Sequence, residues 1–259
     1  MPSYKLIDSH CHIFSEEFDG DRFIILKRAY EKGIIGIVES ALDVKTALKT
    51  LHEIESPTTN VKIYLSVGLN PSSLDATYFK ENYKFIEDNI QRLTAIGEIG
   101  LDFYQVENQY DREKQRSYFK SFISLANEHK LPIIVHSRSA GKYALEVLVE
   151  SRAEKVLLHA FDGSFKSAKL GVENGFFFSI PPSVAYSLQK RKLVKKLPLE
   201  QILLETDSPA LSPVKGVRNT LENLVVSLNE IAKLKSTDVK ELAEVTFKNT
   251  VKLFNIRNL

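Results

Sequence analysis

Short apolar runs alternate with longer amphipathic segments along the chain. Most of the runs are apolar at successive positions, without the polar alternation of a half-exposed strand, and this continuity is typical of parallel strands buried on both faces. The sequence therefore predicts eight strands, at residues 4–7, 34–38, 61–67, 94–99, 131–135, 155–158, 175–179 and 201–204.

The segments between these strands have the periodicity of helices that cover a sheet with one face. One apolar stripe at 79–90 has spacings of four, three and four, and similar stripes fall at 118–126 and 221–232. Each stripe predicts an amphipathic helix. Asp238 and Glu241 have the Asp-x-x-Glu spacing of a helix start, so we expect the last helix to begin there.

Eight strand–helix repeats predict an α/β fold of the (β/α)8 TIM-barrel type, here in the form of a metal-dependent hydrolase. An open doubly wound sheet is the alternative, and the number of strands favours the barrel. The chain has no Gly/Ser-rich linker and no internal repeat, so we expect one domain over residues 1–259.

Composition narrows the class of protein further. Hydrophobic residues make up 43% of the chain and charged residues 26%, as in folded globular proteins. The net charge of +2 neither requires nor excludes a polyanionic partner. A single cysteine excludes an internal disulfide and predicts the cytoplasm, and no apolar run approaches the roughly 20 residues of a membrane span. The sequence is compatible with a monomer.

Side chains that bind metals fall at the ends of the predicted strands. The carboxyl ends of barrel strands meet at one face, which is where barrel enzymes place their active sites. We therefore expect six residues to converge there: His10, His12, Glu98, His136, His159 and Asp207.

Spacing and number refine this expectation. His10 and His12 are two apart, so they project to the same side of an extended segment. Six ligands exceed the needs of one tetrahedral ion and suit two divalent cations about 3.5–4 Å apart, with Glu98 as the bridge. Imidazole and carboxylate donors are compatible with Zn²⁺, Mn²⁺ or Mg²⁺.

The chain closely resembles the TatD family of metal-dependent deoxyribonucleases, within the amidohydrolase-like barrels. The resemblance rests on motifs that occur in family order and span most of the chain. They are Ile7-Asp8-Ser9-His10-Cys11-His12, Ala95-Ile96-Gly97-Glu98-Ile99-Gly100-Leu101-Asp102, Ile134-Val135-His136-Ser137-Arg138, His159-Ala160-Phe161-Asp162-Gly163 and Leu204-Glu205-Thr206-Asp207-Ser208-Pro209.

The resemblance implies a division of the ligands. His10, His12, Glu98 and Asp207 would hold a first metal, and Glu98, His136 and His159 a second. It also implies hydrolysis of DNA phosphodiesters, often as a 3′-to-5′ exonuclease. We expect attack by a metal-activated water, with Glu98 and Asp207 as the catalytic carboxylates and Asp207 accepting the proton.

Two segments depart from the family pattern. The family often has Gly-x-His-Pro after the third strand, where this chain has Gly68-Leu69-Asn70-Pro71. An Asn-Glu-Pro stretch late in the family corresponds to Arg218-Asn219-Thr220, which lacks the acid. These differences bear on the substrate more than on metal binding.

Further residues near strand ends are candidates for supporting roles. Arg138 could grip a phosphate and Tyr104 could stack on a base, so we group both with Asp102 as substrate-binding candidates. Asp8 and Glu205 point into the barrel, where they either orient ligands or serve as structural carboxylates.

Cys11 lies between two inward histidines, so we expect it to face outward as a buried core thiol. His52 and His129 lie in helical patterns, away from the strand ends, and are expected at the surface. The basic run at 190–192, with Lys195 and Lys196, would attract a DNA backbone or form a solvated helix face, and we favour the solvated face.

Two alternatives remain beside the nuclease hypothesis. The same metals could act on another ester, a lactone, an amide or a misacylated tRNA, because they polarise carbonyl groups as well as phosphoryl groups. A non-catalytic binding barrel is the other alternative, and the complete ligand set argues against it.

Overall fold

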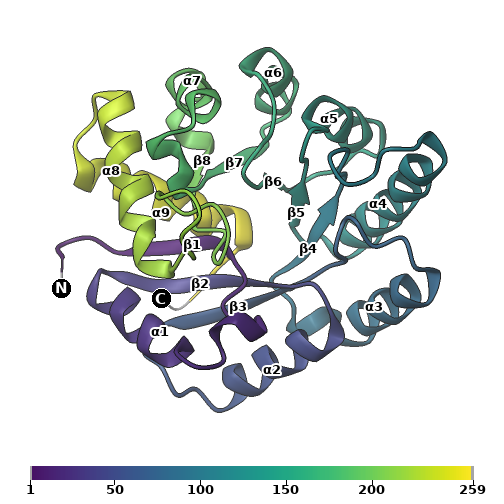
Figure 1. Cartoon of the computed structure of the whole chain (residues 1–259), viewed down its shortest axis with the longest axis horizontal. Coiled ribbons are helices and arrows are strands. Elements are labelled where there is room, and N and C mark those ends of the chain that lie inside the picture. Colours follow the sequence, from purple (N-terminus) through teal and green to yellow (C-terminus); the bar gives the residue numbers. More distant parts are fainter. Residues whose placement is uncertain (1, 258–259) are drawn as a thin grey trace.

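Eight parallel strands follow one another in sequence order around a barrel, and helices surround them (Figure 1). The structure is a computed structural model that describes residues 2–257. The strands are β1 (Leu6–Cys11), β2 (Ile34–Ala41), β3 (Lys62–Val67), β4 (Ala95–Gly100), β5 (Ile133–His136), β6 (Val156–Leu158), β7 (Phe177–Ile180) and β8 (Ile202–Leu204).

A helix follows each strand, and a further helix ends the described chain. The helices are α1 (Arg22–Glu31), α2 (Val44–Glu55), α3 (Ala76–Asn89), α4 (Gln109–His129), α5 (Gly141–Glu150), α6 (Phe165–Glu173), α7 (Leu188–Lys196), α8 (Leu224–Lys235) and α9 (Val239–Phe254). As predicted, α9 begins after Asp238, whose carboxylate accepts hydrogen bonds from the backbone N–H groups of Lys240 and Glu241.

All eight predicted strands are confirmed, and the TIM barrel with them. The largest error is at β1, which was predicted at 4–7 and extends to Cys11. The second half of β1 is polar, so the apolar run from which the strand was predicted ends before the strand does. These polar residues are nevertheless fully buried, and hydroxyl groups of Thr206 and Ser40 hydrogen-bond Asp8 and His10. His10 therefore lies within the strand, and only His12 follows it.

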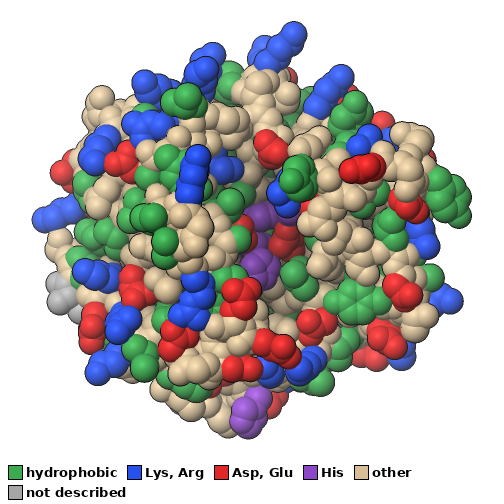
Figure 2. Space-filling view, viewed as in Figure 1, with side chains coloured by type: hydrophobic (Ala, Val, Ile, Leu, Met, Phe, Trp, Pro, Cys, Tyr) green, Lys and Arg blue, Asp and Glu red, His purple; other side chains and the backbone are tan. Residues whose placement is uncertain are grey.

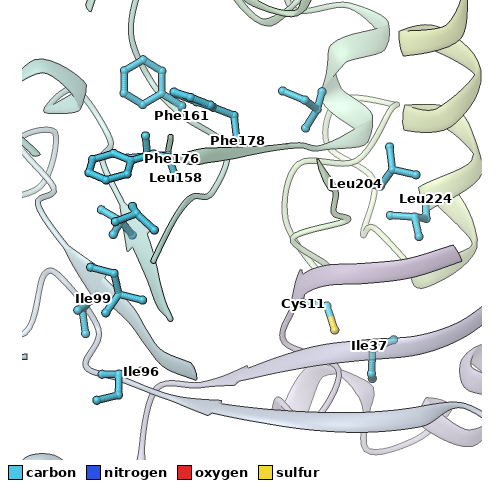
Figure 3. Packing of buried hydrophobic residues seen from close by; sticks show 14 of the residues in the cluster. Cys11, Ile37, Ile96, Ile99, Leu158, Phe161, Phe176, Phe178, Leu204 and Leu224 are labelled. Carbon is cyan, nitrogen blue, oxygen red and sulfur yellow. The ribbon is translucent and has the colours of Figure 1, made fainter. Parts of the chain in front are cut away.

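Apolar packing fills two layers. The larger lies between the strands and the surrounding helices, where Phe161, Phe176 and Phe178 pack together (Figure 3). The smaller fills the inside of the barrel and includes Leu253 and Phe254 of α9. Helix α9 thus closes the amino-terminal end of the barrel and leaves the carboxyl ends of the strands for the site.

The join between β1 and β8 depends on side chains. Within residues 2–257 the strand ladders run from β1 to β8 and no ladder pairs those two strands directly. Instead, Asp8 accepts hydrogen bonds from the backbone N–H of Thr206 at 2.9 Å and from its hydroxyl at 2.5 Å. The Ser9 hydroxyl donates to the carbonyl of Leu204 at 2.8 Å.

We call this join between β1 and β8 the seam. Two backbone hydrogen bonds continue it beyond the ends of the strands. The N–H of Asp207 donates to the carbonyl of His10 at 3.0 Å, and the N–H of His12 donates to Ser208 at 2.9 Å. The seam therefore fixes the segment after β8 against the end of β1.

Within residues 2–257, every helix is too short or too polar to span a lipid bilayer. The predictions of a single domain over residues 1–259 and of a cytoplasmic location stay predictions.

The seam makes Asp8 important for stability. Asp8→Ala should lower the free energy of unfolding by about 2–4 kcal/mol, because buried donors on Thr206 would lose their acceptor. Urea unfolding followed by circular dichroism measures the change. Asp75→Ala removes an exposed helix cap and should cost only about 1 kcal/mol. Equal losses in the two variants would contradict the role of the seam.

Candidate metal centre

The six predicted ligands converge at the carboxyl ends of the strands. They come from β1, β4 and β5 and from the residues just after β1, β6 and β8. Figure 2 views this end of the barrel and shows histidine side chains in a central hollow, with acidic side chains beside them.

The first group of ligand atoms lies beside the seam. Nε2 of His10 is 3.2 Å from Oδ1 of Asp207 and 3.5 Å from Oε2 of Glu98. Nε2 of His12 is 3.4 Å from the same Glu98 oxygen and 3.5 Å from Oδ1 of Asp207. The two imidazoles therefore face the two carboxylates, as their spacing of two residues predicts.

The second group meets the other oxygen of Glu98. Oε1 is 2.5 Å from Nδ1 of His136 and 3.1 Å from Nε2 of His159. Each oxygen of this carboxylate thus serves a different pair of histidines. The geometry suits a bridging ligand between two cations.

The donor set fits divalent cations. Nε2 of His10 is buried and has no hydrogen-bond partner among the described residues, although it points at two carboxylates. Among residues 2–257, three overlapping groups of these ligands bring their donor atoms within 4.8 Å of one another. Imidazole nitrogens and carboxylate oxygens at such separations can share one ion.

The electrostatics of the centre favour a cation as well. Burial alone would raise the pKa of Glu98, but the neighbouring His159 and His136 hold it well below its usual range. Burial alone would lower the pKa of His159, but Glu98 and Glu205 raise it well above its ordinary value. The pKa of His136 is also raised, so protons on His136 and His159 balance the charge of Glu98, and a divalent cation would displace these protons on binding.

Buried polar groups orient the first pair of histidines. The hydroxyl of Ser40, on β2, is 2.9 Å from Nδ1 of His10, and its carbonyl is 2.7 Å from Nδ1 of His12. Both contacts leave Nε2 of each ring directed at the carboxylates. Sequence reasoning missed Ser40, although its place near the end of a strand could have marked it.

Two carboxylates lie beside the second pair of histidines. Oδ2 of Asp102 is 3.1 Å from Nε2 of His136, and Oε2 of Glu205 is 3.6 Å from Nδ1 of His159. Glu205 accepts hydrogen bonds from the backbone N–H of Ala160 at 2.8 Å and from the hydroxyl of Ser179 at 2.6 Å, which fix it beside His159, and both roles predicted for it stay predictions. Asp102 is only 3% exposed, so it is placed to hold His136, and its predicted contact with substrate stays a prediction.

Backbone geometry places the two catalytic candidates. Asp207 has a φ of +54°, in the left-handed region that aspartate tolerates better than most residues. Gly68 lets the segment after β3 approach Glu98 closely, since a Cβ there would lie 2.1 Å from the Glu98 carbonyl oxygen. Any side chain at Gly68 would displace Glu98.

Two tyrosines with a cation beside each ring are exposed on the surface. Tyr104 is 63% exposed, and the Arg138 guanidinium lies 3.8 Å from its ring centre. Tyr186 is 40% exposed and has the Lys215 ammonium 5.1 Å from its ring centre. The loops after β4 and β5 supply the first pair, and those after β7 and β8 supply the second, which sequence reasoning missed.

Lys190, on α7, was another unrecognised neighbour of the site. Its ammonium donates to the carbonyl of Ala160 at 2.9 Å, directly after the ligand His159. Burial lowers the pKa of this lysine, while Glu205 and Asp162 act in the opposite direction.

Other predicted residues lie away from the ligand atoms. Cys11 is buried on the helix side of β1, with its sulfur 3.7 Å from the carbonyl of Val38, as expected of an outward core thiol. His52 and His129 are exposed, also as expected. The side chain of Asn70 is exposed and accepts a hydrogen bond from the Ser72 backbone.

Comparison with known sequences identifies relatives over nearly the whole chain. The model of the family described as "TatD related DNase" matches residues 7–255. Deoxyribonuclease TATDN3 from Homo sapiens is 43% identical over 258 residues, covering 96% of this chain and 94% of that protein. The uncharacterized metal-dependent hydrolase MJ1582 from Methanocaldococcus jannaschii is 35% identical, covering 99% of this chain and all of that protein.

Comparison with solved structures gives a matching result. The TatD homolog YJJV from Escherichia coli superimposes with a TM-score of 0.87 at 27% identity, covering 97% of this chain and 98% of that one. An organophosphate hydrolase engineered from a promiscuous lactonase has a TM-score of 0.72 at 15% identity, with coverage of 97% and 96%, and shares the fold alone.

The role of Ser40 can be tested by removing its hydroxyl. Ser40→Ala should weaken divalent-cation binding about tenfold, because His10 would lose the partner that fixes its ring. Titration calorimetry of metal-stripped protein with Mn²⁺ or Zn²⁺ measures the affinity. Ser121→Ala, on an exposed helix face, is the matched control and should leave it unchanged. Equal affinities in both variants would refute the orienting role.

Proposed function

This chain belongs to the TatD-related DNase family, and on that basis we propose that it is a metal-dependent hydrolase that cleaves DNA phosphodiester bonds. The observation that carries the proposal is the division of Glu98 between two groups of histidines, with Asp207 completing the first group. A site of this form suits hydrolysis by an activated water.

We assign the ligands accordingly. His10, His12, Glu98 and Asp207 would hold one divalent cation, and Glu98, His136 and His159 a second. We propose two ions drawn from Mg²⁺, Mn²⁺ and Zn²⁺, since nitrogen and oxygen donors are mixed in both groups. When bound, such ions lower the pKa of water and offset negative charge on a phosphoryl group.

Side chains of the protein would then accept the proton, orient the imidazoles and bind the phosphate. Asp207 is 8% exposed at the mouth of the site, where its carboxylate can accept a proton from the attacking water. Ser40 and Asp102 contact the imidazoles of His10, His12 and His136, so these ligand atoms need little rearrangement when substrate arrives. Arg138 offers a planar pair of donors to a phosphate oxygen.

The two tyrosine–cation pairs support nucleic acid as the substrate. An exposed ring can stack on a base, and the cation beside it can meet a phosphate. Tyr104 with Arg138 and Tyr186 with Lys215 come from loops on either side of β6, which leads to the ligand His159. We infer a single-stranded segment of DNA lying across the site, and, from the family resemblance, cleavage from the 3′ end.

The first test of the proposal is activity. Purified protein with Mg²⁺, Mn²⁺ or Zn²⁺ should degrade single-stranded DNA, whereas Glu98→Gln and Asp207→Asn should each reduce the rate by at least about a hundredfold, because each removes a ligand charge. Gel assays of a labelled oligonucleotide measure the rate, and circular dichroism checks that the variants fold.

An ester and a lactone panel should be assayed in parallel. Turnover of these compounds without cleavage of DNA would contradict the nuclease and favour the alternative hydrolase. Wild-type rates in both carboxylate variants would contradict the assignment of the site.

A second test addresses base stacking. Tyr104→Leu should raise the KM for single-stranded DNA about tenfold with little change in kcat, because a stacked base contributes about 1–3 kcal/mol. The same variant should hydrolyse bis(p-nitrophenyl) phosphate, which lacks bases, with an unchanged KM. Steady-state kinetics on both substrates would refute the stacking role if the two KM values changed together.

A further inference from the structure

The basic run of α7 separates into three environments. Lys190 turns toward the site and donates to Ala160. Arg191 pairs with Glu230 of α8 at 2.8 Å. The run is therefore not one uniform solvated face, and three lysines remain on the side of α7 that faces α6: Lys192, Lys195 and Lys196.

These lysines line a groove between α6 and α7. Its apolar floor includes Phe165 and Leu193, and Lys166 at the start of α6 adds a fourth ammonium. The groove has a volume of about 570 Å³. Figure 2 shows Lys and Arg side chains gathered over the edge of the molecule that α6 and α7 form.

The positive charge of this groove is not neutralised within the described chain. Over residues 2–257, no carboxylate lies within 4.0 Å of the ammonium of Lys166, Lys192, Lys195 or Lys196. Nearby lysines differ, since Lys169 pairs with Glu173 on the same helix. Four lysines around one concave apolar surface are complementary to a polyanion with flat apolar groups.

The groove is also joined to the metal centre. The side chain of Gln189, which lines the groove, donates to the carbonyls of Phe161 and Gly163 in the loop that follows His159. Phe165 lies six residues after His159, so their Cα atoms are at most about 22 Å apart along an extended chain. A strand of a few nucleotides can span that distance.

We propose that the groove between α6 and α7 binds the backbone of single-stranded DNA beyond the phosphodiester that is cleaved. The ammonium groups would contact phosphates, and Phe165 would receive a base or sugar. This inference rests on the proposed nuclease function and adds a binding surface outside the metal centre. It predicts that affinity for DNA depends on the length of the strand.

The test variant replaces Lys192, Lys195 and Lys196 together with glutamine, which keeps good helix propensity and removes three charges. Binding of a fluorescent phosphorothioate oligonucleotide of about 20 nucleotides to the metal-loaded protein is measured by anisotropy. The Kd should rise about tenfold or more, and the slope of log Kd against log salt should fall by about 2, from roughly 0.7 per phosphate contact.

A matched control loses the same charge away from the groove. Lys5, Lys32 and Lys62 are exposed near the amino-terminal ends of β1, β2 and β3. Their triple glutamine variant should keep the wild-type Kd. In the α7 variant, kcat and KM for bis(p-nitrophenyl) phosphate should also stay at wild-type values, because this compound is too small to reach the groove.

The outcomes separate the two proposals. An unchanged Kd in the α7 variant, or equal losses in both triple variants, would overturn the groove as a DNA site. Binding that depends on the groove in a protein that cleaves no DNA would leave the groove standing and overturn the nuclease. Loss of turnover of the small phosphodiester in the α7 variant would overturn the claim that the groove acts outside the metal centre.

Discussion

The candidate site depends on the closure of the barrel between β1 and β8. Within the described residues no strand ladder makes this join, so the buried carboxylate of Asp8 and the hydroxyl of Ser9 replace it. The same seam sets His10 opposite Asp207. The same contacts thus close the barrel and position the first group of candidate ligands. A substitution that breaks these contacts would displace His10 and Asp207 before it disturbed the rest of the core.

Glu98 joins this half of the site to the other. Its two oxygens face different pairs of histidines, and Gly68 allows the backbone that carries it to lie close to the neighbouring segment. The carboxylate is nearly buried, so its charge acts at short range on His136 and His159 with little solvent screening. The position of the Glu98 side chain therefore sets the geometry of both groups of histidines.

The sequence was sufficient to predict the strands and the convergence of the six candidate ligands, because both follow simple rules. Buried parallel strands appear in the sequence as apolar runs, and their carboxyl ends must meet at one face. Residue type and position therefore predicted which six side chains would converge there. Ser40 also lies near the end of a strand, but serine is not a typical metal ligand, and its role depends on how β2 pairs with β1. The separation of Lys190, Arg191 and Lys192 was equally hidden, because it arises from how α7 packs against its neighbours.

The pleat of β1 directs Cys11 away from the candidate metal centre. Cys11 lies between the candidate ligands His10 and His12 in sequence, yet its sulfur faces Val38 and Glu39 on the other side of the strand. Burial raises the pKa of its thiol well above the ordinary value, and nearby Asp8 and Glu39 add to the effect. Since the thiolate is the form that oxidants attack, the one sulfur beside the centre is kept in its unreactive form. Adjacent residues of β1 thus place the candidate ligand His10 and the thiol of Cys11 on opposite sides of the strand.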